Sequence, residues 1–141
     1  MSRHNLVDLA MVEELKIIAG EDHVIYNDAE KLESYSHDEV ADKHYAGMPE
    51  VVVKPASTEE ISAIMKLANR KLVPVTPRGA GSGLSGGAVP VSGGVVLSLE
   101  RMNRILEIDR DNLIAILEPG VITNDFNNEV QKEGLFLPVT R

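Results

Sequence analysis

The sequence contains no cysteine among its 141 residues. Disulfides, thiolate metal sites and a cysteine nucleophile are therefore excluded, and a cytoplasmic location fits this composition. No stretch approaches the roughly 18 consecutive apolar residues that a membrane-spanning helix requires, so we expect no transmembrane segment. Basic residues are also scarce, because 14 Lys and Arg face 22 Asp and Glu, for a formal net charge of -8. Nucleic-acid binding requires a basic surface, so we expect no nucleic-acid partner.

The first 48 residues predict an N-terminal extension of helix and loop. A first helix ends at Gly20, and the residues at helical spacing that predict it are Leu6, Leu9, Ala10, Glu13, Ile17 and Ile18. The stretch from Glu21 to Pro49 is polar and mixed in composition. It predicts only a short helix over Ala29–Glu33, followed by loop.

A β-α-β unit follows Pro49. Val51–Val53 is a β-branched run, and Ser57 with Glu60 three residues later predicts a capping box at the start of a helix of about 14 residues. Its predicted apolar face comprises Ile61, Ile64, Met65, Leu67 and Ala68. Leu72–Val75 is the next predicted strand. Such a crossover connection favours parallel strands.

The second half of the chain predicts a buried strand, a hairpin and a helix. Val95–Leu99 is the strand, and the turn residues 110–112 separate the two arms of the hairpin, Ile105–Asp109 and Ile114–Glu118. The predicted helix has Thr123 or Asn124 as its cap, Phe126 and Val130 on its inner face, and Gly134 at its end. Leu135–Pro138 then begins an extended segment that has no partner strand, which is typical of a sequence that continues.

The most informative segment is Thr76–Gly94, which reads TPRGAGSGLSGGAVPVSGG and holds seven of the eleven glycines. Glycine adopts positive φ readily and allows backbone N–H groups to approach a ligand. A strand that opens into such a loop is a common phosphate-binding device. Arg78 stands at the mouth of the loop, and its guanidinium is a fork that suits phosphate.

The loop has three other possible interpretations. Residues 81–86 read G-x-G-x-x-G, and Glu100 stands about where a ribose-binding acid would be in a nicotinamide-binding fold. That site requires a helix directly after the loop, and the glycines and Pro90 before Val95 leave no room for one. A Walker A site fails because the chain contains no Gly-Lys-Ser or Gly-Lys-Thr. A flexible surface loop is the remaining alternative, although long loops between strands are usually functional.

Two histidines and several acids gather near residue 40. The spacing of His37 and His44 matches no common zinc pattern, so we expect a solvated loop and no metal site. The acidic cluster from Asp38 to Asp42 predicts a charged, solvent-facing surface.

Several separated motifs occur in the order typical of one family: PRGAGSGLSGGAVPVSGGVVLSLERMNRILEID and, further on, EPGV. From about residue 32 to 138 the chain resembles the FAD-binding domain of the vanillyl-alcohol oxidase and p-cresol methylhydroxylase family. It is most similar to the branch of FAD-linked D-2-hydroxyacid dehydrogenases, such as the D subunit of glycolate oxidase and D-lactate dehydrogenase. The resemblance implies an α+β fold with a βαββ-type mixed sheet and flanking helices. Residues 49–141 would form the first lobe of that domain, and the lobe would be incomplete.

The resemblance also implies FAD as cofactor, with its pyrophosphate on the glycine-rich loop. The cofactor-binding positions that carry over are Arg78, Gly79, Ala80, Gly81, Ser82, Gly83, Ser85, Gly86, Gly120 and, less directly, Pro138. Family members that bind FAD covalently have histidine where this chain has Ser82, so the resemblance implies noncovalent FAD.

The implied activity is that of an FAD-dependent oxidoreductase that converts a small D-2-hydroxyacid of the glycolate or D-lactate type into its 2-oxoacid. No residue of this chain matches a catalytic position of the family. We therefore expect these 141 residues alone to bind FAD weakly or not at all and to show no turnover. The alternative is a noncatalytic binding or assembly fragment that pairs with a second copy or with another subunit, which could also bring it to a membrane surface.

Overall fold

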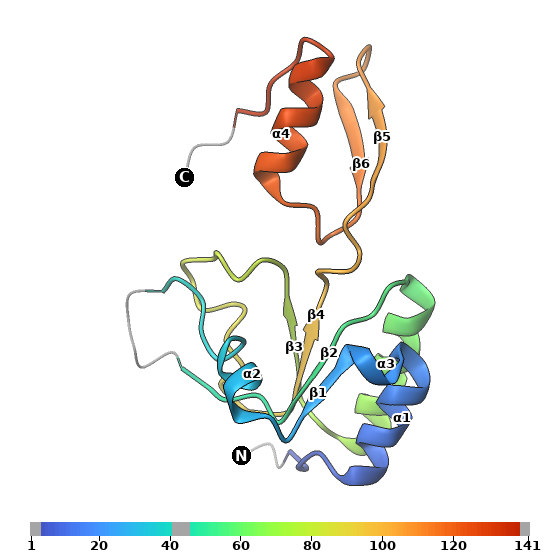
Figure 1. The fold of residues 1–141 in the computed structure, drawn as a ribbon, viewed down its shortest axis with the longest axis vertical. Helices are drawn as coiled ribbons and strands as arrows, with labels where there is room; N and C mark the ends of the chain where they lie inside the picture. The colour runs from blue at the N-terminus through green and yellow to red at the C-terminus, as the bar shows by residue number, and fades with distance from the viewer. Residues whose placement is uncertain (1–3, 41–45, 139–141) are drawn as a thin grey trace.

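The computed structural model describes residues 4–40 and 46–138, and it confirms a mixed α+β architecture (Figure 1). In chain order the elements are α1 (Leu9–Ala19), the 3-10 turn η1 (Glu21–His23), β1 (Val24–Tyr26), α2 (Ala29–Glu33), β2 (Val51–Val53), α3 (Thr58–Lys71), β3 (Val75–Arg78), β4 (Val95–Ser98), β5 (Ile105–Asp109), β6 (Ile114–Leu117) and α4 (Thr123–Lys132).

A four-stranded sheet with the order β1-β2-β4-β3 organises most of the chain. β2, β4 and β3 run parallel, whereas β1 is antiparallel to β2. Helices α1 and α3 cover one face, and α2 lies on the other (Figure 1). Val51 and Val53 pack towards α1 and α3, while Val52 packs with Leu32 of α2. All of β2 is buried, which explains its unbroken apolar sequence.

The predicted β-α-β unit is confirmed, but its second strand begins later than predicted. Helix α3 starts at the Ser57 cap, whose Oγ accepts the N–H of Glu60 at 3.2 Å, and ends at Leu72, which adopts a φ of 56°. The chain needs Val73 and Pro74 to leave this left-handed cap, so β3 covers Val75–Arg78 in place of Leu72–Val75. β3 is an edge strand, which is where a proline such as Pro77 is tolerated.

The predicted first helix is confirmed as α1, with Gly20 as its C-cap, but its buried face differs from the residues whose spacing predicted it. The buried residues are Met11, Val12, Leu15 and Ala19. Leu6, Leu9 and Ile17 are exposed instead. Helical spacing alone fits both faces, and the choice depends on where α3 packs. Within the predicted face of α3, Ile64, Leu67 and Ala68 are buried as expected, whereas Met65 is 44% exposed.

Strand β1 was not predicted from the sequence, because three residues are too few to show the alternation of apolar and polar side chains. β1 pairs with β2, which follows Pro49. Residues 4–40 therefore supply one strand of the sheet and two helices that pack against it. The boundary between residues 48 and 49 stays a prediction.

The predicted hairpin is confirmed as β5 and β6, and it lies with α4 beyond the carboxyl end of the sheet (Figure 1). Asp109 closes the turn by accepting the N–H groups of Asp111 and Asn112, both at 3.0 Å. Helix α4 begins at Thr123, but neither Thr123 nor Asn124 caps it. The N-cap is Ile122, without a side-chain hydrogen bond. Leu135–Pro138 forms no strand and folds back along α4, where the N–H of Leu137 donates to Oδ1 of Asn127 at 3.1 Å.

Candidate functional site

The glycine-rich loop connects two parallel strands without a helix. It leaves the carboxyl end of β3, passes on the side of the sheet that carries α2, and returns to the amino end of β4 (Figure 1). Two backbone contacts fix the return, since the N–H of Val95 donates to the carbonyl of Pro74 at 2.9 Å and the N–H of Glu50 donates to that of Gly94 at 2.9 Å. The absence of a helix between Gly86 and Val95 confirms that the nicotinamide-type interpretation fails.

The backbone N–H groups of the loop have little to do within the protein. None of those from residue 79 to 88 donates to a backbone carbonyl in the ranges 4–40 and 46–138. Most of these residues are exposed. Native proteins pair the great majority of their backbone N–H groups, with water where no protein acceptor exists. Successive exposed N–H groups in a tight loop form an anion-binding concavity.

Individual glycines of the loop meet requirements that other residues would not. Gly81 and Gly86 have φ of 72° and 74°, a region that favours glycine. A Cβ on Gly87 would meet nothing within 4 Å, so the backbone there is open to a ligand. These open backbone positions and unpaired N–H groups fit a bound pyrophosphate.

The guanidinium of Arg78 lies at the mouth of the loop, as expected, but it binds protein carbonyls. Its Nη1 donates to the carbonyl of His37 at 2.6 Å, and its Nη2 donates to that of Ser34 at 3.4 Å. It also lies 5.6 Å from the ring centroid of Tyr35. Arg78 therefore connects the start of the glycine loop to the segment after α2.

That segment forms a second wall of the loop, which the sequence analysis missed. The N–H of Glu39 donates to the carbonyl of Gly83 at 3.0 Å. Asp38 is only 7% exposed, so the prediction of a solvent-facing acidic cluster is wrong for this residue. Its neighbours His37 and Glu39 are exposed, and His44 lies outside the described residues. The burial of one acid between exposed neighbours reflects tertiary packing that composition does not report.

A polar cluster lies at the carboxyl ends of the central strands, next to this wall. Lys54 follows β2 and its Nζ lies 2.5 Å from Oε1 of Glu100, while Oε2 of Glu100 accepts from Tyr35 and Ser98 at 3.2 and 3.1 Å. Burial disfavours both charges, but the ion pair outweighs it. The pKa of Lys54 is therefore raised and the pKa of Glu100 is lowered. Glu100, a candidate ribose ligand in the rejected interpretation, instead holds Tyr35 against the sheet.

Gly120 lies close to the start of the loop, as the resemblance implies. The N–H of Gly120 donates to the carbonyl of Met102 at 2.7 Å. The carbonyl of the preceding Pro119 is 4.0 Å from where a Cβ on Gly79 would lie. The structure thus brings together two motifs that are 40 positions apart in the sequence.

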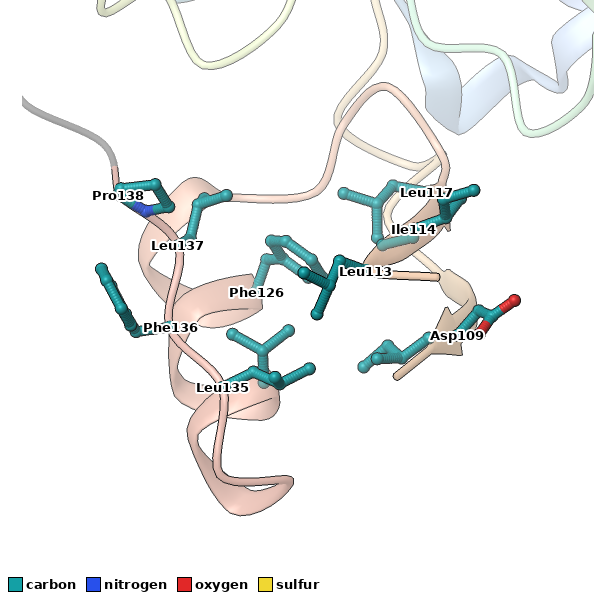
Figure 2. Close-up of a pocket in the computed structure, with 12 residues that line it drawn as sticks. Asp109, Leu113, Ile114, Leu117, Phe126, Leu135, Phe136, Leu137 and Pro138 are labelled. Atoms are coloured by element: carbon teal, nitrogen blue, oxygen red, sulfur yellow. The ribbon is translucent and has the colours of Figure 1, made fainter. Parts of the chain in front are cut away.

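Pro138 lies in a different place. It lines an apolar groove of about 530 Å³ between the hairpin, α4 and the segment 135–138 (Figure 2), and no residue of the glycine loop lines this groove. Figure 2 shows Leu135, Phe126 and Leu113 pointing into the space between the helix and the hairpin. Phe136 and Leu113 are each 75% exposed.

Within the described ranges no group of three or more His, Asp or Glu side chains could hold a metal ion. In the same ranges no helix is long and apolar enough to cross a membrane.

A family model described as an FAD binding domain matches residues 49–140. The chain belongs to this family. FAD is the cofactor of such a domain, and the resemblance on which the sequence analysis relied is confirmed.

Curated relatives of the chain include proteins named as D-lactate dehydrogenase, as a glycolate oxidase subunit and as an FAD-linked oxidoreductase. The chain is 43% identical over 136 residues to a D-lactate dehydrogenase of Anaerostipes hadrus, covering 96% of this chain and 28% of that protein. It is 43% identical over 126 residues to the glycolate oxidase subunit GlcD of Bacillus subtilis (strain 168), covering 89% of this chain and 26% of that protein. The chain thus spans little more than a quarter of the length of these relatives.

Solved structures confirm the fold. A structure of p-cresol methylhydroxylase superposes with a TM-score of 0.78 at 26% identity, covering 89% of this chain and 25% of that one. A 4-ethylphenol oxidase from Gulosibacter chungangensis gives a TM-score of 0.78 at 28% identity, covering 92% and 27%.

Proposed function

We propose that the glycine loop of this FAD-binding domain holds the pyrophosphate of FAD through backbone N–H groups. The observation that carries the proposal is the run of N–H groups from residue 79 to 88 without backbone acceptors in the described part of the chain. The positions assigned to this role are Gly79, Ala80, Gly81, Ser82, Gly83, Ser85 and Gly86. Gly120 is included because the carbonyl of the adjacent Pro119 lies near Gly79. Arg78 takes part by holding the loop, and Pro138 is not assigned to the cofactor.

The binding is noncovalent in this proposal. The chain has no cysteine. At position 82, where family members that bind FAD covalently have histidine, it has an exposed serine. Denaturation should therefore release the flavin from the protein.

The activity proposed for the full-length protein is oxidation of a small D-2-hydroxyacid, of the glycolate or D-lactate type, to the 2-oxoacid. The names of these two curated relatives support this substrate class. FAD, when bound, supplies the electron-accepting chemistry. The residues described above bind and orient it, and no catalytic role is assigned to any of them. A cytoplasmic location, with any membrane attachment made through partners, belongs to the same proposal.

Flavin content tests the cofactor assignment. The full-length polypeptide should purify with flavin absorbance or bind added FAD, and it should reduce an artificial electron acceptor when given D-lactate or glycolate. A purified protein that has no flavin and does not bind added FAD would refute the proposal. The 141 residues alone should bind FAD weakly or not at all and should show no turnover, because they cover little more than a quarter of the length of the relatives they match.

A second candidate function, assembly, is favoured by the apolar groove. Among the described residues the β5–β6 sheet has only two strands, so each strand has an unpaired edge. The hairpin and the segment after α4 also carry exposed apolar side chains: Leu106, Leu113, Ile114, Ile116, Leu117 and Phe136. Exposed apolar edges promote association between chains. A second copy of this chain presents the same edge, so we propose self-association through this groove as the alternative to an FAD-binding role.

A further inference from the structure

Asp38 carries a buried carboxylate oxygen that has no hydrogen-bond partner. Its Oδ1 accepts the N–H of Val40 at 2.9 Å, whereas Oδ2 is buried and unpaired within the described residues. A buried charged acceptor without a donor costs free energy, and such groups in native proteins require an explanation. The function proposed so far does not use this oxygen.

The unpaired oxygen lies against the glycine loop. A Cβ on Gly83 would be 3.6 Å from Oδ2 of Asp38. The neighbouring residue, Glu39, donates its N–H to the carbonyl of the same Gly83. Oδ2 is therefore next to the middle of the loop, where the backbone N–H groups have no backbone acceptor in the described ranges.

The protein holds Asp38 in this position through Arg78. The guanidinium binds the carbonyls of Ser34 and His37, the latter being the residue directly before Asp38. Tyr35 adds a second attachment, because its hydroxyl donates to Glu100 beyond the end of β4. Two charged side chains, Arg78 and Glu100, thus hold this segment in place. A loop that only faced solvent would not require them.

The chemistry of a carboxylate limits what it can face. It repels a phosphate, and it accepts hydrogen bonds from O–H and N–H groups. An FAD molecule offers hydroxyl groups on either side of its pyrophosphate, and the loop offers its own N–H groups.

We infer that Asp38 is a ligand-binding residue of the glycine-loop site. When FAD is bound, Oδ2 accepts a hydrogen bond from a neutral donor, either a hydroxyl of the FAD or an N–H of the loop that has closed around it. This inference rests on the proposed FAD role of the loop. It assigns to the segment after α2 a direct part in the site, which the glycine motif alone does not indicate.

The test is Asp38→Asn in the full-length polypeptide, with FAD affinity measured by flavin fluorescence. Asparagine has the same shape and can still accept from Val40, but it can place an N–H₂ group where Oδ2 lies. We expect FAD to bind about 10- to 100-fold more weakly, as for loss of a hydrogen bond to a charged group. Unchanged or tighter FAD binding would overturn the inference, and tighter binding would mean that the carboxylate faces phosphate.

Inorganic pyrophosphate, measured by competition with FAD, separates the two donors. If the donor is a hydroxyl of FAD, Asp38→Asn weakens FAD and leaves pyrophosphate affinity unchanged. If the donor is an N–H of the loop, both affinities fall by a similar factor. Glu39→Gln is the matched control, because that side chain is exposed and adjacent, and it should change neither affinity.

The stability of the ligand-free protein guards against a purely structural role. Since Oδ2 has no partner, Asp38→Asn should leave the melting temperature unchanged or raise it, and a marked decrease would overturn the inference. Asp38→Ala, which also removes the acceptor for Val40, should lower the melting temperature and weaken FAD as much as Asp38→Asn does. Wild-type protein that binds neither FAD nor pyrophosphate would refute the proposed function itself. Wild-type binding with an unaffected Asp38→Asn variant would refute only this assignment.

Discussion

The guanidinium of Arg78 occupies the position that a side chain at Gly81 would need. A Cβ on Gly81 would overlap Nη2 of Arg78. Arg78 is fixed there by the carbonyls of Ser34 and His37, so it cannot move aside without losing them. Glycine at position 81 is thus required by its own positive φ and by the arginine three residues earlier.

Gly81→Val in the full-length protein should abolish FAD retention and leave the domain folded. The substitution strains the backbone at a φ of 72° and displaces Arg78 from the second wall of the site. Flavin content after gel filtration and far-UV circular dichroism measure the two outcomes. Gly134→Val is the control, because Gly134 also has a positive φ of 75° but lies after α4, outside the glycine loop, and it should leave FAD retention unchanged. Unchanged FAD affinity in Gly81→Val would contradict the pyrophosphate assignment.

Arg78→Lys should loosen the segment after α2. A lysine is a point donor and cannot span two carbonyls as the guanidinium fork does. We expect faster hydrogen exchange at the N–H of Glu39, which donates to Gly83 across the two walls. The control is Arg70→Lys, which alters an exposed ion pair with Glu14 on the opposite side of the sheet.

The salt dependence of FAD binding tests whether the guanidinium of Arg78 contacts phosphate directly. If Arg78 positions the loop, Arg78→Gln, which removes the charge that Arg78→Lys keeps, should lower FAD affinity without reducing its dependence on salt concentration. Unchanged exchange at Glu39 together with a weaker salt dependence would show that the guanidinium contacts phosphate directly.

Much of the fold was predictable because its signals are local. Three features depend only on residues close in sequence, and the structure has all three: the Ser57 cap, the β-branched strand Val51–Val53 and the turn closed by Asp109. The glycine loop was predictable as a connection without a helix because the missing helix can be read from residue spacing.

The misses share a physical cause, which is that tertiary contacts made the choice. The sequence of α1 offers two apolar faces, and packing against α3 selects Leu15 over Ile17. The burial of Asp38 depends on an arginine 40 positions away. Composition indicates the burial of Asp38 only weakly, because the sequence around it is not apolar enough to predict a buried segment.

Gly120→Ala should destabilise the protein by about 1–3 kcal/mol, the usual range for overpacking a close backbone contact. An added Cβ would overlap the carbonyl of Leu99 and lie 2.8 Å from that of Met102, and neither backbone atom can rotate away. Urea denaturation measures the loss. Gly134→Ala is the control, because it has a positive φ of 75° but nothing within 4 Å. Gly120 itself has no positive φ, so a Gly120→Ala variant as stable as wild type would show that the overlap is relieved without cost.

Glu118 should make stability fall in acid. Its carboxylate accepts from the backbone N–H, Nε and Nη2 of Arg104 at 2.8, 3.0 and 2.6 Å. These donors hold the pKa of Glu118 below its ordinary value of 4.5, so the unfolded state binds the proton more readily than the folded state. The stabilisation is therefore complete above about pH 4.5 and is lost as the pH falls through the lowered pKa.

Glu118→Gln removes this titration. The variant should be less stable than wild type at neutral pH, and the difference should shrink as the pH is lowered below 4.5. Melting temperatures of the two proteins measured from about pH 3 to 7, a range that brackets the titration of a carboxylate, should converge at low pH. A constant difference across the series would mean that Arg104 stabilises the protonated side chain equally well.

Phe136→Asp should reduce self-association at the apolar groove. Phe136 is 75% exposed on the segment after α4 and lines the groove (Figure 2). A carboxylate there would have to be buried unpaired if a second copy covered the groove. Light scattering over a concentration series measures the mean mass of each variant. Ile17→Asp is the matched control, since that side chain is 84% exposed on α1, away from the hairpin. Wild-type protein that stays monomeric at high concentration, or a Phe136→Asp variant that associates as wild type does, would show that a second copy does not occupy the groove.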